Sequence, residues 1–194
     1  YNPARSYPLV CFFHGACGDE YWFTNRGGCS FSDQWLGYAN YVNTKVFASY
    51  RQQATDPAIV VWPTLRRNGS WNTFYVRQTT NLLDNFISRF NIDTNRVYVG
   101  GLSGGLPSAW DFLGLRPGSV AGAMVLAGES GNTPATSLKN IPLWAFCATD
   151  DEFTSFPPAV QGFVGSLRRA GGNPRYTEYA SGAHVPAIML GMST

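Results

Sequence analysis

The chain has 194 residues, 44% of them hydrophobic and 13% charged, which is typical of one folded domain and excludes a disordered segment. No run approaches the roughly 20 apolar residues of a membrane-spanning helix, and a formal net charge of +2 gives no electrostatic basis for binding nucleic acid. We therefore expect a single soluble domain over 1–194, monomeric, that acts on a neutral small molecule or polymer and binds neither nucleic acid nor membrane.

Short apolar runs alternate along the chain with helix-like segments. The runs predict strands at 8–13, 58–62, 96–100, 120–127, 142–147 and 175–179. They are continuous more than alternating, which is typical of strands that are buried on both faces of a parallel sheet. The helix-like segments are 73–90, 106–113 and 158–170, and a further helix around 33–43 is one interpretation of a less regular stretch. This order predicts an α/β fold, an open, mostly parallel sheet of about six strands with helices on both faces.

A sharp turn motif stands between the third predicted strand and the helix that follows it. Gly101-Leu102-Ser103-Gly104-Gly105 has the spacing Gly-x-Ser-x-Gly of a nucleophile elbow. The glycines let the backbone turn tightly and leave room beside the serine, whose hydroxyl is then held where a base can reach it. The motif predicts Ser103 as a nucleophile.

The remaining groups of an acyl-transfer site follow in a recognisable order. Open α/β sheets place working groups at the carboxyl ends of their strands, and such a site needs a base and an orienting carboxylate. Of the two histidines, His184 follows the last strand and is the predicted base, whereas His14 ends the first strand and is expected to shape the oxyanion loop. Asp151 is the favoured acid, and the adjacent Asp150 remains the alternative.

The stabilising donors and the substrate contacts are predicted from neighbouring loops. Backbone N–H groups of Ala16 and Gly104 are expected to form the oxyanion hole, with Cys17 as a second choice for the first donor. Aromatic loop residues can stack on a substrate or simply cover the core; as candidates for substrate binding we name Tyr21, Trp22 and Trp71. Two isolated histidines and the lack of a Cys-x-x-Cys pair argue against a zinc site, so no metal is expected.

The four cysteines allow three pairings, which sequence alone does not resolve. Cys17 and Cys29 share one glycine-rich loop and could form a disulfide, whereas Cys11 and Cys147 lie in apolar runs and are expected to be separate buried thiols. A loop disulfide, together with only two lysines, favours a secreted or periplasmic location.

Several segments resemble one known family. The run from Asn91 to Gly105, the run Tyr7-Pro8-Leu9-Val10 leading to Phe13-His14-Gly15, and the segments 141–146 and 170–179 resemble the α/β-hydrolase serine esterases of the feruloyl esterase and polyhydroxybutyrate depolymerase-like group. The resemblance implies an α/β-hydrolase fold and a cofactor-free serine carboxylester hydrolase, commonly secreted. It does not fix the acid or the alcohol of the ester.

The chain also departs from that family. Cys147-Ala148 replaces the usual His-Gly pair at the end of the acid strand, and Gly104 stands where a larger residue is common. The first two family strands are missing and little sequence follows His184, so we expect a minimal or trimmed version of the fold.

The residues and the resemblance together predict an esterase that cleaves neutral feruloyl, acetyl or polyester-type esters through an acyl-enzyme on Ser103. Two alternatives remain. The first is an acyltransferase on the same triad, which would pass the acyl group to an alcohol instead of water. The second is a non-catalytic module that binds carbohydrate or a partner on a hydrolase scaffold.

Overall fold

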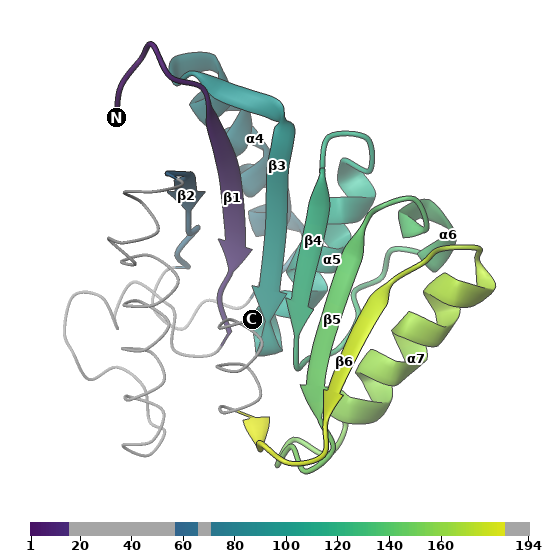
Figure 1. The fold of residues 1–194 in the computed structure, drawn as a ribbon. Helices are drawn as coiled ribbons and strands as arrows, with labels where there is room; N and C mark the ends of the chain where they lie inside the picture. The colour runs from purple at the N-terminus through teal and green to yellow at the C-terminus, as the bar shows by residue number, and fades with distance from the viewer. Residues whose placement is uncertain (16–56, 66–70, 185–194) are drawn as a thin grey trace, which may run out of the picture.

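A six-stranded sheet organises the part of the chain that the structure describes. The computed structural model describes residues 1–15, 57–65 and 71–184 (Figure 1). Every strand pair is parallel, and the order across the sheet is β2-β1-β3-β4-β5-β6. The strands are β1 (Tyr7–Phe13), β2 (Ile59–Val61), β3 (Ile92–Leu102), β4 (Gly122–Leu126), β5 (Leu143–Ala148) and β6 (Arg175–Tyr179). The six predicted strands and the parallel sheet are thereby confirmed.

Strand β3 is longer than the apolar run that predicted it. The prediction covered 96–100, whereas the strand begins at Ile92, which lies opposite Tyr7 of β1. The register between β1 and β3 then shifts between Tyr7 and Leu9. Pairing with β1 therefore extends the strand over the polar residues of 93–95.

Within the described residues, four α-helices and one 3-10 turn connect the strands. They are α4 (Thr73–Arg89), η2 (Ser103–Gly105), α5 (Leu106–Leu115), α6 (Ala135–Leu138) and α7 (Phe156–Arg169). The predicted helices at 73–90, 106–113 and 158–170 are confirmed, with small shifts at their ends. The helix considered around 33–43 lies outside the described residues.

Local sequence explains where these helices begin. The Asn72 side chain accepts hydrogen bonds from the backbone N–H groups of Phe74 and Tyr75 at 3.0 and 3.2 Å, which caps α4. Helices α5 and α7 each carry proline in their first turn, at Pro107 and Pro157, where the missing N–H has no helical partner to lose.

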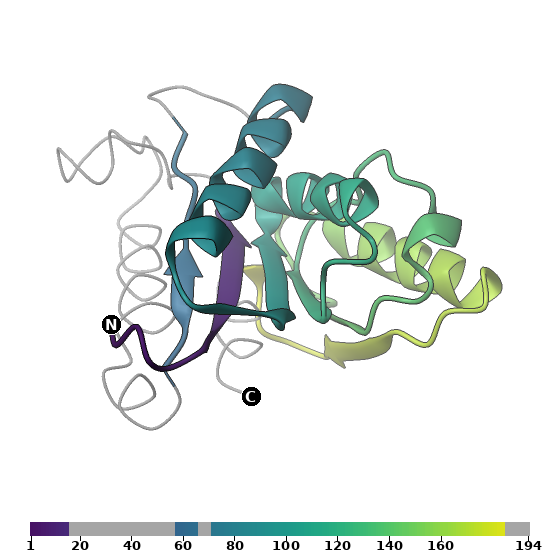
Figure 2. The same cartoon turned by 90° about the horizontal axis from the view of Figure 1, so that it is seen from above.

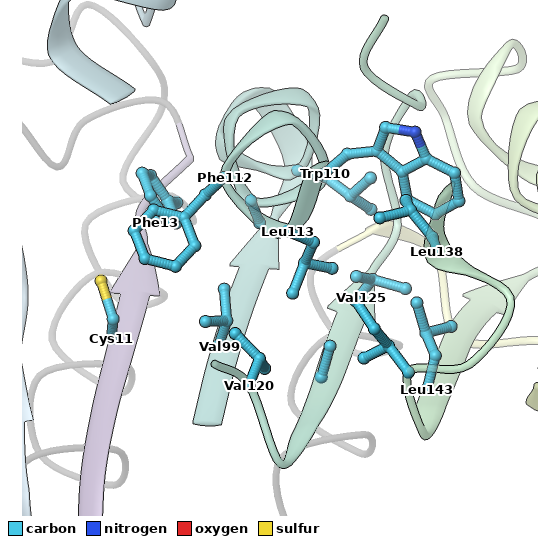
Figure 3. Packing of buried hydrophobic residues seen from close by; sticks show 14 of the residues in the cluster. Cys11, Phe13, Val99, Trp110, Phe112, Leu113, Val120, Val125, Leu138 and Leu143 are labelled. Carbon is cyan, nitrogen blue, oxygen red and sulfur yellow. The ribbon is translucent and has the colours of Figure 1, made fainter. Parts of the chain in front are cut away.

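All four helices cover the same face of the sheet (Figure 2). Alternate strand residues, including Cys11, Val99 and Val125, point to this face and share one apolar cluster with helix side chains such as Phe112 and Leu113. Figure 3 shows these side chains meeting between α5 and the sheet. This cluster contains most of the buried apolar side chains of the described residues.

The opposite face carries a smaller cluster of strand residues. It is built from Phe12, Leu102, Leu126, Ala127 and Phe146. No helix of the described residues contributes to it, so the prediction of helices on both faces is confirmed for one face only. Away from the carboxyl ends of the strands this face opens into an apolar groove of about 500 Å³, where Tyr98 is 40% exposed.

Two buried cysteines lie within the sheet. Cys11 of β1 and Cys147 of β5 are free thiols, as predicted, and burial raises the pKa of both. Cys17 and Cys29 lie outside the described residues. Among the helices that the structure describes, none has the length and apolar character needed to cross a bilayer.

Candidate active site

Ser103 lies in a strained turn at the carboxyl end of β3. Its φ of +49° is in the left-handed region, which costs a non-glycine residue roughly 1–2 kcal/mol, and only 7% of the residue is exposed. The turn is closely packed against the end of β1, and this packing holds it in place. A Cβ on Gly105 would overlap the carbonyl oxygens of Phe13 and His14. The motif Gly-x-Ser-x-Gly therefore forms a tight strand-to-helix elbow that rests on the end of β1.

The structure brings Ser103 together with two residues that are distant in sequence. The His184 Nε2 atom lies 3.1 Å from Ser103 Oγ, and the His184 Nδ1 atom lies 2.8 Å from Asp151 Oδ2. The side chains of His184 and Asp151 are fully buried. These three predicted residues come from the carboxyl ends of β3, β6 and β5, which lie at the same edge of the parallel sheet.

The hydrogen bonds fix the direction of proton transfer. An ionised carboxylate can only accept, so the bond to Asp151 assigns the proton to His184 Nδ1. The Nε2 atom of the neutral ring is then free of a proton and accepts the bond from the Ser103 hydroxyl. This arrangement can take a proton from Ser103 as its oxygen attacks an electrophile.

Asp151, and not Asp150, contacts the imidazole. The second oxygen of Asp151, Oδ1, accepts a hydrogen bond from the backbone N–H of Phe153 at 2.8 Å, which orients the carboxylate. The carboxylate of Asp150 instead accepts from the backbone N–H groups of Gly182 and Ala183. The two residues therefore bind different parts of the same loop.

Three residues around His184 were missed by the sequence reasoning as contributors to the site. Glu152 Oε2 accepts a 2.7 Å hydrogen bond from the backbone N–H of His184. The rings of Phe153 and Phe156 lie 4.8 and 5.3 Å from the imidazole, centroid to centroid. Their position in the sequence could have identified them, because all three directly follow or lie close to the predicted acid.

The end of β1 lies against the nucleophile. A Cβ on Gly15 would lie 3.0 Å from the Cβ of Ser103, so the backbone of this residue approaches the elbow closely. Gly104 follows the nucleophile, and among the described residues, its two chain neighbours aside, a Cβ there would meet no atom within 4 Å. The buried His14 ring hydrogen-bonds through Nδ1 with the Gly15 carbonyl at 2.7 Å, which fits its predicted role in shaping this loop. Ala16 and Cys17 lie outside the described residues.

Trp71 also contacts the end of β1. Its indole N–H donates to the carbonyl oxygen of His14 at 2.9 Å, and its ring meets Phe13 edge-on at 5.1 Å. These contacts position the loop beside Ser103, and contact between Trp71 and a substrate stays a prediction. Tyr21 and Trp22 lie outside the described residues. Within the ranges that the structure describes, no cluster of three or more His, Cys, Asp or Glu side chains is arranged to hold a metal ion.

Several esterases are among the solved structures with a similar fold. A thermostable esterase aligns with a TM-score of 0.79 and 27% identity, over 100% of this chain and 54% of that chain. The chain has the α/β-hydrolase fold. A ferulic acid esterase from Anaeromyces mucronatus, in complex with ferulic acid, aligns with a TM-score of 0.64 and 15% identity, over 99% of this chain and 78% of that chain. A carboxylesterase from Mesorhizobium loti aligns with a TM-score of 0.60 and 18% identity, over 93% of this chain and 82% of that chain.

These neighbours confirm the α/β-hydrolase fold that the resemblance implied. The chain spans about half the length of the thermostable esterase. No family model matches the sequence, and no curated protein matches it either. In this chain the site residues follow in the order Ser103, Asp151, His184, which is the order of a nucleophile, acid and base in the α/β-hydrolase fold.

Proposed function

We propose that this chain is a serine carboxylester hydrolase. The observation that carries the proposal is the continuous hydrogen-bonded series from Asp151 through His184 to the strained Ser103, buried at the carboxyl edge of the sheet. Esterases among the solved structures of similar fold support the same activity.

The reaction follows from the proton positions. Ser103 Oγ attacks the ester carbonyl carbon while His184 Nε2 takes its proton, and Asp151 stabilises the imidazolium that forms. The negative charge that develops on the carbonyl oxygen is stabilised by the backbone N–H of Gly104 and, as predicted from the sequence, that of Ala16. His184 then gives its proton to the departing alcohol, which leaves an acyl group on Ser103. Water, deprotonated by His184, releases the acid.

The substrates that fit this site best are neutral esters of the feruloyl, acetyl or polyester type. The aromatic rings of Phe153 and Phe156 flank the base and offer an apolar wall beside the reacting atoms. The net charge of +2 gives no special attraction for polyanions. One similar structure was solved with ferulic acid, so aromatic acid esters come first in a substrate series.

The test compares hydrolysis of p-nitrophenyl acetate, p-nitrophenyl butyrate and methyl ferulate by the wild type and by Ser103→Ala. We expect Ser103→Ala to lower kcat by a factor on the order of 10⁴ or more, because the nucleophile is lost. Ser88→Ala is the matched control, since Ser88 is exposed on α4. A fluorophosphonate probe should label the wild type and Ser88→Ala but leave Ser103→Ala unlabelled. A folded wild type that hydrolyses no faster than Ser103→Ala would contradict the proposal.

A further inference from the structure

Three consecutive carboxylates bind three consecutive residues of the histidine loop. Asp150 Oδ1 accepts from the backbone N–H groups of Gly182 at 2.9 Å and Ala183 at 2.8 Å. Glu152 Oε2 accepts from the backbone N–H of His184 at 2.7 Å. Asp151, between them, hydrogen-bonds to the imidazole itself. The backbone N–H groups of residues 182 to 184 are therefore all bonded to side chains that follow β5.

This loop has a backbone conformation that needs support. Ala183 has a φ of +45°, in the left-handed region that residues with a Cβ rarely adopt, and it directly precedes His184. The single oxygen of Asp150 receives two successive N–H groups, which fixes the peptide planes on both sides of Gly182. Hydrogen bonds to a carboxylate are stronger than those to neutral acceptors, so they hold this turn more firmly than water would.

The contacts also tie the loop after β6 to the end of β5. Thr149 begins this connection, because its hydroxyl donates to the carbonyl of Ala180 at 2.7 Å and its N–H to the carbonyl of Tyr179 at 2.9 Å. The base and its acid therefore sit on two segments that are bonded along their length. A small displacement of the base can cost about 10²-fold in rate, so a rigid connection has a direct catalytic value.

We propose that Asp150 and Glu152 are positioning residues of the hydrolytic site. They act through the backbone of residues 182–184 and hold the His184 ring between Asp151 and Ser103. This inference rests on the proposed esterase function. The inference gives the three consecutive acidic residues separate roles. Asp151 binds the imidazole ring, whereas Asp150 and Glu152 bind the backbone of residues 182–184.

The experiment measures kcat and KM for p-nitrophenyl butyrate in variants at both positions. Asp150→Ala and Glu152→Ala are expected to lower kcat about 10- to 100-fold, with KM within about two-fold of the wild type, because binding contacts stay intact. Asp150→Asn and Glu152→Gln keep an acceptor oxygen and should recover most of kcat. Asp84→Ala is the control, because it removes an exposed carboxylate that hydrogen-bonds to Arg116 at the carboxyl-terminal end of α5. This variant should leave kcat unchanged.

A second variant and a spectroscopic signal keep the test decisive if Asp150→Ala does not fold. Asp150→Glu keeps the charge but moves the oxygen by one methylene group, so kcat should still fall several-fold. The low-field proton resonance of His184 Nδ1–H should weaken in Asp150→Glu and persist in Asp150→Asn.

Each proposal fails in its own way. A wild type without Ser103-dependent turnover would overturn the esterase function. An active wild type with unchanged kcat in the folded Asp150→Ala and Glu152→Ala variants, or in Asp150→Glu, would overturn the positioning role alone. An Asp150→Asn variant as slow as Asp150→Ala would also overturn it.

Discussion

At the scale of single residues, the elbow depends on the absence of a side chain at Gly105. A Cβ at this position would overlap the backbone carbonyl oxygens of Phe13 and His14. We expect Gly105→Ala to lower the free energy of unfolding by about 1–3 kcal/mol, because rigid backbone atoms must move apart. It should also reduce ester hydrolysis, because the end of β1 is displaced from Ser103. Urea denaturation and p-nitrophenyl butyrate turnover measure the two effects.

Gly104→Ala is the matched control for stability. At this adjacent position the same methyl group meets no atom within 4 Å in the part of the chain that the structure describes, its chain neighbours aside, so the free energy of unfolding should change little. Equal losses of stability in the two variants would show that the packing at the end of β1 does not hold the elbow.

Residue identities in the site were predictable to different degrees. Ser103 was predictable because its motif lies between a strand and a helix, and His184 because only two histidines exist. Asp151 was favoured over Asp150, although both follow the same strand and the turn after β5 decides which carboxylate meets the ring. The contact of Glu152 with a backbone N–H is a tertiary contact that leaves no pattern in the sequence.

At the scale of elements, helix α7 carries a glycine that its packing does not require. A Cβ on Gly162 would meet no atom within 4 Å in residues 1–15, 57–65 and 71–184, apart from its neighbours and the backbone of its own helix. Glycine inside a helix is destabilising by roughly 0.5–1 kcal/mol relative to alanine. Gly162→Ala is therefore expected to raise the free energy of unfolding by about that amount. Thermal and urea denaturation of the purified variant would measure the gain.

Gly114 of helix α5 is the matched position at which the same substitution should lower the free energy of unfolding. A Cβ there would overlap the side chain of Thr133, so Gly114→Ala should destabilise the protein although the intrinsic helix preference is the same. A loss in Gly162→Ala, or a gain in Gly114→Ala, would contradict the packing described for these helices.

Elements were predictable where their pattern was long enough. Strand β6 was predicted at its observed bounds, and α4 to within one residue, because apolar runs and a stripe at helical spacing mark them. The four residues of α6 and the three of η2 are too short to show any periodicity. The polar start of β3 was missed because pairing with β1, and not composition, makes it a strand.

At the scale of the whole molecule, the buried thiol of Cys11 couples stability to alkaline pH. Burial raises its pKa, so the folded protein keeps the thiol proton while the unfolded chain releases it above about pH 8.5. Proton release then favours unfolding, and the stability present below that pH is lost as pH rises. We expect the free energy of unfolding to fall between about pH 7.5 and about pH 9.5 in urea titrations under reducing conditions.

Cys11→Ala isolates the contribution of this thiol. The variant should lose less stability over the same pH interval, with a slope smaller by up to about 1.4 kcal/mol per pH unit. Identical slopes in the variant and the wild type would show that Cys11 ionises in the folded state as easily as in the unfolded chain. Cys147 has a raised pKa for the same main reason and contributes to the slope that remains.

The layer arrangement was predictable only in part. Continuous apolar runs indicated strands that are buried on both faces, and residues such as Phe12 and Phe146 are indeed buried on the face without described helices. Towards the amino ends of the strands, however, Tyr98 is well exposed on that face. Strand hydrophobicity alone does not reveal how far a covering layer extends, since aromatic side chains can cover one another.

The wide separation of the site residues in the chain has a consequence for the order of folding. Ser103 and His184 are 81 residues apart, and Asp151 and His184 are 33 apart. Contacts of such high sequence separation are slow to form, because the long loops between them must close first. The hydrogen bonds that join Asp151, His184 and Ser103 therefore exist only where the carboxyl ends of β3, β5 and β6 lie side by side.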